Sequence, residues 1–183
     1  MTAVTRKILT TAAVVAAAAA LVAVPLTAAQ ADDTPARVVT EQGALSDLVP
    51  AAAGPLDGAR AVVVMVSDDG DSAVRLHVYG IDRSVAGRTF GAHLHVGPCV
   101  AGNGAAAGPH YNTDTLAGQV PPRVDETTEV WLDFTATEGG TGHAAAEVPF
   151  VPVPGNRSIV IHQEPTDPNG AAGPRLACLP LSW

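Results

Sequence analysis

The chain of 183 residues contains few aromatic side chains (4%), and its only lysine is Lys7. It has 18 acidic and 10 basic residues, which gives a formal net charge of −8 at pH 7. Proteins that bind nucleic acid need a basic surface and rings on which bases can stack. The composition therefore argues against nucleic acid as a partner, and the negative charge also argues against docking on an anionic membrane.

A sustained helical period is absent, and 18 glycines with 15 prolines indicate many turns. Residues 61–66 are β-branched and residues 73–79 alternate with a period of two; the sequence between them has turn chemistry, which together predicts a hairpin with one buried face. Further strands are predicted at 89–96, 129–134 and 158–162. Several short strands with frequent turns predict an all-β fold, an antiparallel sandwich or barrel.

The first 31 residues have the pattern of a secretory signal. Arg6 and Lys7 precede an apolar run over 8–26, and residues 29–31 (AQA) match a signal-peptidase site. A single membrane anchor is the alternative, because the run has about the length needed to span a bilayer. The cleavage pattern favours a signal peptide over 1–31, so we expect a secreted, extracytoplasmic product that is not held at a membrane after cleavage.

Two ranges are expected in the remaining chain: an N-terminal tail or extension over 32–56, with a short ordered piece, and one domain over 57–183. The chain has two cysteines, Cys99 and Cys178. Two cysteines in an exported domain usually pair, because disulfides persist in an oxidising compartment. Two free thiols are the alternative.

The histidines carry most of the chemical information. His93 and His95 are two residues apart in a predicted strand, so their side chains point to the same face. His110 lies in a predicted loop, and His162 ends a predicted strand. Four imidazoles with no spare thiolate favour copper or zinc. For the pair at 93 and 95 alone, ordinary hydrogen-bonded histidines remain the alternative.

Three other features are given no part in this site. His77 and His143 are expected to have surface or boundary roles. The glycine-rich stretch 102–108 loosely matches a dinucleotide-binding loop, but a proline follows it where a helix is needed, so we interpret it as an ordinary loop. Asn156 begins a glycosylation sequon, which matters only if the source glycosylates its proteins.

Four sequences, GAHLHVGPC, GPHYN, SIVIH and GPRLAC, occur in this order and together resemble the Cu/Zn superoxide dismutase family. The resemblance covers about residues 57–183. It implies a Greek-key antiparallel β-sandwich, a flattened eight-stranded barrel, which agrees with the strands predicted above.

The resemblance also implies roles for individual residues. Those matching the copper ligands are His93, His95, His110 and His162. His110 further resembles the histidine that bridges copper and zinc in two-metal members. Arg175 resembles the arginine that holds the incoming anion beside copper, and Cys99 and Cys178 resemble the intrasubunit disulfide.

The chain departs from the two-metal pattern after His110. Two-metal members place two further histidines and an aspartate there, whereas residues 111–141 contain no histidine. Zinc prefers a closed site of four nitrogen or sulfur ligands, so zinc is doubtful as a cofactor and the chain resembles copper-only extracellular members. His110 then needs another partner for its second nitrogen, for which Asp125 or Glu126 is our hypothesis.

The function implied by the resemblance is conversion of superoxide to dioxygen and hydrogen peroxide by Cu(II)/Cu(I) cycling. In this hypothesis His110 binds Cu(II), releases Cu(I) and carries a proton, while Arg175 attracts the superoxide anion. One alternative is a secreted copper-binding module of the same fold without catalysis. Another is a zinc hydrolase with three histidines and an open water position. A monomer and a homodimer are both compatible with the sequence.

Overall fold

The structure of the chain is a computed structural model that describes residues 36–183. The predicted signal peptide, residues 1–31, lies outside the described residues. Among the described residues, no helix is both long enough and apolar enough to cross a membrane.

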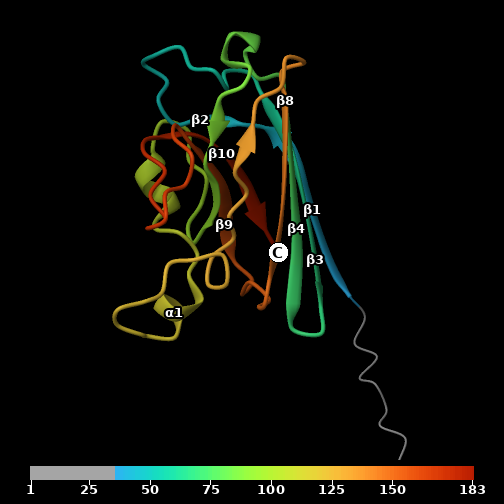
Figure 1. The fold of residues 1–183 in the computed structure, drawn as a ribbon, viewed down its shortest axis with the longest axis vertical. Helices are drawn as coiled ribbons and strands as arrows, with labels where there is room; N and C mark the ends of the chain where they lie inside the picture. Colours follow the sequence, from blue (N-terminus) through green and yellow to red (C-terminus); the bar gives the residue numbers. More distant parts are fainter. Residues whose placement is uncertain (1–35) are drawn as a thin grey trace, which may run out of the picture. The chain divides into compact units, whose positions relative to one another are not determined.

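The described strands form a sandwich of two four-stranded antiparallel sheets (Figure 1). In order across the first sheet, the strands are β1 (Arg37–Ala44), β3 (Arg60–Asp68), β4 (Asp71–Tyr79) and β8 (Thr141–Val148). Across the second sheet they are β2 (Ser46–Asp47), β10 (Arg175–Ser182), β9 (Asn156–His162) and β6 (Ala92–His95). A small antiparallel pair joins β5 (Thr89–Phe90) to β7 (Phe134–Thr135).

The connections between the sheets have the Greek-key character that was predicted. The chain passes from the first sheet to the second between β4 and β6, returns at β8, and crosses again to β9, so neighbouring strands are often not consecutive in sequence. β1 and β2 follow one another directly and link the sheets along one edge. The antiparallel sandwich is therefore confirmed, although the two sheets do not close into a true barrel.

The predicted hairpin is confirmed as β3 and β4. Asp69 and Gly70 connect the strands, and both have positive φ angles, 49° and 92°. An Asp-Gly pair accepts this conformation readily, and the resulting turn matches the twist of the two strands. Alternate residues such as Val63 and Leu76 are buried at 2% exposure and pack between the sheets.

The range 32–56 contributes more than the predicted short ordered piece. Within it, β1 pairs along its whole length with β3, and β2 pairs with β10. Val39 is the one buried residue of β1, and this strand lies at the edge of its sheet. An edge strand with one partner needs little apolar alternation, which explains why the sequence pattern of β1 is weak.

Two predicted strands are shorter or interrupted. The range 89–96 divides at Gly91 into β5 and β6, and the range 129–134 pairs regularly only at its end, in β7. Before β7, single backbone bridges join Trp131 to His93 and Glu129 to Asn112. Loops hold the remaining short elements, the 3-10 turns η1 (Arg83–Val85) and η2 (Gly104–Ala107) and the one-turn helix α1 (Thr113–Leu116).

Candidate metal centre

Three segments bring four histidines together on the outer side of the second sheet. His93 and His95 point away from Leu94, which packs in the core between the sheets. β9 is the antiparallel neighbour of β6 and ends at His162, while a backbone bridge places His110 beside His95. One ring nitrogen from each of the four histidines lies within 4.8 Å of the corresponding nitrogen of every other.

The four rings are withdrawn from solvent to different degrees. His93 and His95 are completely buried and His162 is 4% exposed, whereas the side chain of His110 is 17% exposed. Their ring centroids are 4.0 to 6.4 Å apart. Solvent therefore reaches this cluster mainly past His110.

Backbone carbonyls determine which nitrogen of two rings carries hydrogen. Nδ1 of His95 lies 3.0 Å from the carbonyl oxygen of Gly108, and Nδ1 of His162 lies 3.1 Å from that of Gly173. A carbonyl can only accept, so each Nδ1 must donate and each Nε2 must carry a lone pair. These two Nε2 atoms are 3.3 Å apart and have no hydrogen to share between them.

Side chains impose the same arrangement on the other two rings. His110 donates from Nδ1 to Oε2 of Glu129 over 2.9 Å. His93 donates from Nε2 to the hydroxyl of Thr166 over 2.7 Å, and its Nδ1 is buried without any hydrogen-bond partner. Each of the four rings thus donates outward and directs a lone pair toward the common centre.

A cation satisfies this arrangement. The unpartnered Nδ1 of His93 and the facing Nε2 atoms of His95 and His162 are unfavourable when buried without one. An imidazole donor set suits copper, zinc, iron or nickel, so the residues present fit a metal such as copper. The four histidines are a metal-binding group, the only group of this kind among residues 36–183.

Burial keeps three of the rings neutral, which is the protonation state that binds a metal. Desolvation lowers the pKa of His95 from 6.5 to about 3 and that of His162 to about 4. Desolvation, together with the neighbouring imidazoles, lowers the pKa of His93 further still. At neutral pH these nitrogens are lone-pair donors before any ion arrives.

The partner of His110 is Glu129, which corrects the hypothesis of Asp125 or Glu126. Asp125 instead accepts from Thr127 within its own turn, and Glu126 is exposed. Glu129 is 3% exposed and also accepts from Nε1 of Trp131 and Nδ2 of Asn112, at 2.9 and 3.0 Å. Its burial opposes ionisation, but the hydrogen bonds from its three partners hold its pKa below the ordinary value.

Glu129 has two companions that sequence reasoning also missed, Thr166 and Asp133. Thr166 donates from its hydroxyl to Oδ1 of Asp133 over 2.6 Å while accepting from His93. A signal for the two acids was present in the alternation of 129–134. Glu129, Trp131 and Asp133 share the face opposite the buried core residues, which is the face turned toward the histidines.

Arg175 lies opposite His162 in the register of β10 and β9. Its guanidinium donates to the carbonyls of Gly104 and Gly108, the latter over 2.6 Å. The carbonyl of Gly108 therefore holds both Arg175 and His95. Partial desolvation lowers the pKa of Arg175, and the positive charge contributes to lowering the pKa of His95 and His162. The structure thus places a fixed cation beside the four-histidine group.

A disulfide joins Cys99 to Cys178, across 79 residues of sequence. Cys178 is buried in a small apolar cluster with Ala107 and Val160 on the outer side of the second sheet. The bridge thereby ties the loop that carries Gly104 and Gly108 to β10, the strand that carries Arg175.

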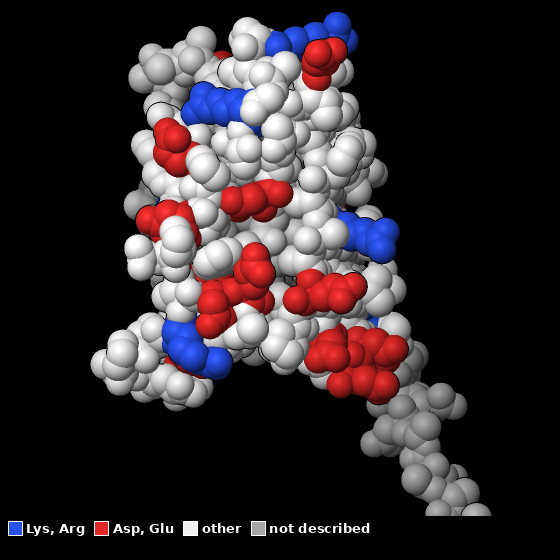
Figure 2. Space-filling view, viewed as in Figure 1, with Lys and Arg blue, Asp and Glu red and all other residues white. Residues whose placement is uncertain are grey.

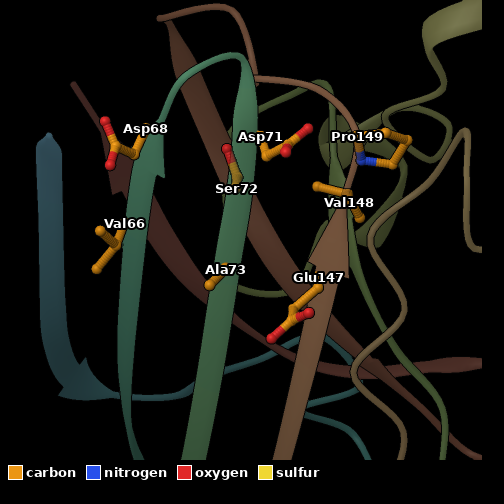
Figure 3. Close-up of a pocket in the computed structure, with 8 residues that line it drawn as sticks. All are labelled: Val66, Asp68, Asp71, Ser72, Ala73, Glu147, Val148 and Pro149. Atoms are coloured by element: carbon orange, nitrogen blue, oxygen red, sulfur yellow. The ribbon is translucent and has the colours of Figure 1, made fainter. Parts of the chain in front are cut away.

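Two of the three features set aside in the sequence lie elsewhere, whereas the glycine-rich stretch 102–108 belongs to the site, because the carbonyls of Gly104 and Gly108 accept from Arg175 and that of Gly108 also from His95. His77 and His143 are exposed and opposite one another on the outer face of the first sheet. Asn156 is exposed at the start of β9. A surface hollow of about 430 Å³ lies near the end of the β3–β4 hairpin, and none of the predicted site residues lines it. Figure 3 shows its lining, in which the acidic side chains of Asp68, Asp71 and Glu147 lie among small and aliphatic ones.

Several solved structures share this fold, among them the following two. A double mutant of a SOD-like protein from Bacillus subtilis superposes with a TM-score of 0.54 at 18% sequence identity, over 78% of this chain and 97% of that one. The clock protein EA4 gives a TM-score of 0.51 at 16% identity, over 81% of this chain and 94% of that one. No family model matches the sequence, and no curated protein is similar to it. The fold of this chain is therefore that of a SOD-like β-sandwich.

Proposed function

We propose that this chain is a secreted, copper-only superoxide dismutase, which converts superoxide to dioxygen and hydrogen peroxide. The observation that carries the proposal is the set of four imidazole nitrogens that converge with their lone pairs inward, beside the fixed charge of Arg175. The SOD-like fold supports it, because in this chain that fold brings the four histidines predicted from the sequence into one group.

The residues that would hold copper are His93 through Nδ1 and the other three histidines through Nε2. A bound copper ion supplies the one-electron exchange that the reaction requires. Nδ1 of His110 is occupied by the hydrogen bond to Glu129 and is not open to a second metal. This supports a site for a single ion, without zinc.

His110 is the proposed proton carrier. It is the most exposed of the four rings, and Glu129 holds its Nδ1–H in place. When Nε2 of His110 takes up a proton it no longer offers a lone pair, so metal binding and proton transfer exclude one another on this atom. Glu129 stabilises the doubly protonated ring, and the proton at Nε2 faces the centre, where the anion needs it.

Arg175 is the proposed anion-binding residue. Superoxide is negative, and the chain without its predicted signal peptide has 18 acidic and 8 basic residues, since Arg6 and Lys7 are lost. Acidic side chains cover more of the face in Figure 2 than basic side chains do. The general field therefore repels superoxide, and a fixed guanidinium beside the centre provides the local attraction.

Export and assembly complete the proposal. The disulfide supports an oxidising, extracytoplasmic compartment, in which the signal sequence would place the protein. We propose a monomer or homodimer that acts on superoxide alone, with neither nucleic acid nor a membrane as a partner.

The test combines metal analysis with direct measurement of superoxide decay on the same purified protein. We expect one copper ion per chain, no stoichiometric zinc, and rapid catalytic decay. The double variant His93→Ala/His162→Ala should lose both copper and activity, whereas the control His77→Ala/His143→Ala, which removes two exposed histidines, should keep both. Copper without catalytic decay would identify a copper-binding module instead, and stoichiometric zinc would contradict the copper-only proposal.

A further inference from the structure

We propose that Thr166, supported by Asp133, is the positioning residue that decides which nitrogen of His93 faces the metal centre. The inference rests on the proposed four-histidine metal site, although the proton arrangement it describes exists without a metal. Thr166 lies in the loop after β9, and Asp133 directly precedes β7. The hydrogen bonds from His93 to Thr166 and from Thr166 to Asp133, called the relay below, therefore join the beginning of β6 to two segments that are distant in sequence.

The direction of the relay follows from the hydrogen-bonding capacity of Asp133. Its Oδ2 accepts from the backbone N–H of Thr166 over 2.7 Å, and its Oδ1 accepts from the Thr166 hydroxyl over 2.6 Å and from the N–H of Ala92 over 3.2 Å. A carboxylate offers acceptors only, so the single hydroxyl hydrogen of Thr166 is committed to Asp133. Toward His93, at 2.7 Å, the hydroxyl oxygen can then only accept.

His93 must consequently carry its hydrogen on Nε2 and its lone pair on Nδ1. It is the one member of the four-histidine group that presents Nδ1 to the centre; the other three present Nε2. Because His93 is completely buried, no solvent water can replace the acceptor of its Nε2–H. Without the relay, the alternative tautomer would direct an N–H toward the centre, where a metal ion needs a lone pair.

The backbone is shaped to bring Thr166 to this position. Gly91 donates its N–H to the carbonyl of Glu164 over 2.8 Å, which fastens the loop to the start of β6. A Cβ at Gly91 would lie 2.6 Å from the Cβ of Ala172 and 3.2 Å from the hydroxyl oxygen of Thr166. Any side chain at this position would push the loop away, so the glycine is needed for the approach of Thr166 to His93.

The experiment compares four single variants with the wild-type chain. Thr166→Val keeps the shape of the side chain without the hydroxyl, Thr166→Ser keeps the hydroxyl, and Asp133→Asn offers hydrogens where Asp133 offers an acceptor. Thr141→Val is the matched control, because it removes a threonine hydroxyl at the start of β8 that bonds only to the Thr137 hydroxyl, in an exposed place. The first measurement is ¹⁵N NMR of the imidazole rings in the metal-free proteins, which identifies the protonated nitrogen of His93. The second is the Cu(II) dissociation constant from competition with a chelator.

We expect the Nε2–H form of His93 in the wild type, Thr166→Ser and Thr141→Val. Thr166→Val and Asp133→Asn should shift the ring toward Nδ1–H, and Thr166→Val should bind Cu(II) about 10- to 100-fold more weakly. An unchanged His93 tautomer and copper affinity in Thr166→Val would overturn the inference, as would an Nδ1–H wild type. If Thr166→Val does not fold, the tautomer of His93 in the other two variants tests the inference. Nδ1–H in Asp133→Asn with Nε2–H in Thr166→Ser would support it, and Nε2–H in both would overturn it. A wild type that shows Nε2–H but binds no copper would contradict the proposed function and leave the relay standing.

Discussion

Glu129 accepts a hydrogen bond from His110 over 2.9 Å, between Oε2 and Nδ1, while the opposite side of the imidazole faces three other histidines. The carboxylate is buried but accepts from Trp131 and Asn112 as well, so it is held from several sides. A ring that is partly exposed to solvent thereby acquires a defined orientation and a defined tautomer. A carboxylate can orient a metal-binding histidine in this way without a second ion.

The first prediction concerns the charge of Glu129. Glu129→Gln preserves size but turns an amide NH₂ toward one of three N–H donors, so we expect the free energy of unfolding to fall by about 1–3 kcal/mol. Copper affinity should fall about 10- to 100-fold, because a neutral amide oxygen holds the Nδ1–H of His110 more weakly than the carboxylate does. Urea unfolding and chelator competition measure the two effects. Glu126→Gln, an exposed neighbour, is the control, and equal behaviour of the two variants would remove Glu129 from the site.

The second prediction separates anion attraction from metal binding. Arg175→Ala should lower the rate of superoxide decay by about tenfold or more while copper content stays near that of the wild type, because the local positive charge is lost. Arg175→Lys should recover part of the rate, since it restores the charge without the paired donors that reach Gly104 and Gly108. The remaining activity of Arg175→Ala should no longer fall as ionic strength rises, because the local attraction that salt would screen is gone. Proportionate loss of copper and activity would mean that the arginine merely supports the fold.

The third prediction is a loss of stability in acid for the metal-free protein. Unfolded imidazoles take up protons near pH 6.5, whereas in the folded protein His162 and His95 remain neutral down to about pH 4 and about pH 3. Between pH 6.5 and about pH 4 the unfolded state therefore binds more protons than the folded state does. The free energy of unfolding should therefore fall as pH decreases from 6.5 toward 4, by about 1.4 kcal/mol per pH unit for each ring. Urea titrations between pH 7.5 and 4.5 measure this slope.

The double variant His77→Ala/His143→Ala should keep the same slope, because the two histidines it removes are exposed on the first sheet, away from the four-histidine group. Saturating copper should raise stability at pH 7, since a ligand that binds only the folded state stabilises it. A free energy of unfolding that is independent of pH in this window would contradict the burial of neutral imidazoles.

The fourth prediction concerns the disulfide. The Cys99–Cys178 bridge closes a loop of about 80 residues, so Cys99→Ser/Cys178→Ser should lower the free energy of unfolding by about 4–5 kcal/mol in the chain-entropy model. The same variant releases the loop that carries Gly104 and Gly108 from β10. We therefore expect Arg175 to be held less firmly by the carbonyls of Gly104 and Gly108, and superoxide-decay activity per bound copper to fall. The two proteins are compared at a temperature at which both are folded. Unchanged activity per copper would show that the loop keeps its position without the bridge.

Local patterns in the sequence determined much of the fold. The alternation of β3 and β4 and the Asp-Gly turn between them depend on neighbouring residues only, so the amino-acid sequence is enough to predict them. The edge strand β1 was underestimated because a strand with one partner has a weak apolar pattern. The interruption at Gly91 was missed because the requirement for glycine comes from Ala172 and Glu164, which approach from another part of the chain.

For the metal-binding group too, the sequence determined some features and the tertiary structure decided the others. By itself, the sequence determined which four histidines to consider and that His93 and His95 share one face, since strand periodicity is local. Only the tertiary structure decided the groups that hold those rings: Glu129 for His110, Thr166 with Asp133 for His93, and the carbonyls of Gly108 and Gly173 for His95 and His162. These partners lie between 11 and 73 residues away in sequence. Their choice depends on the paths of loops in space, and no periodicity of the chain records such a path.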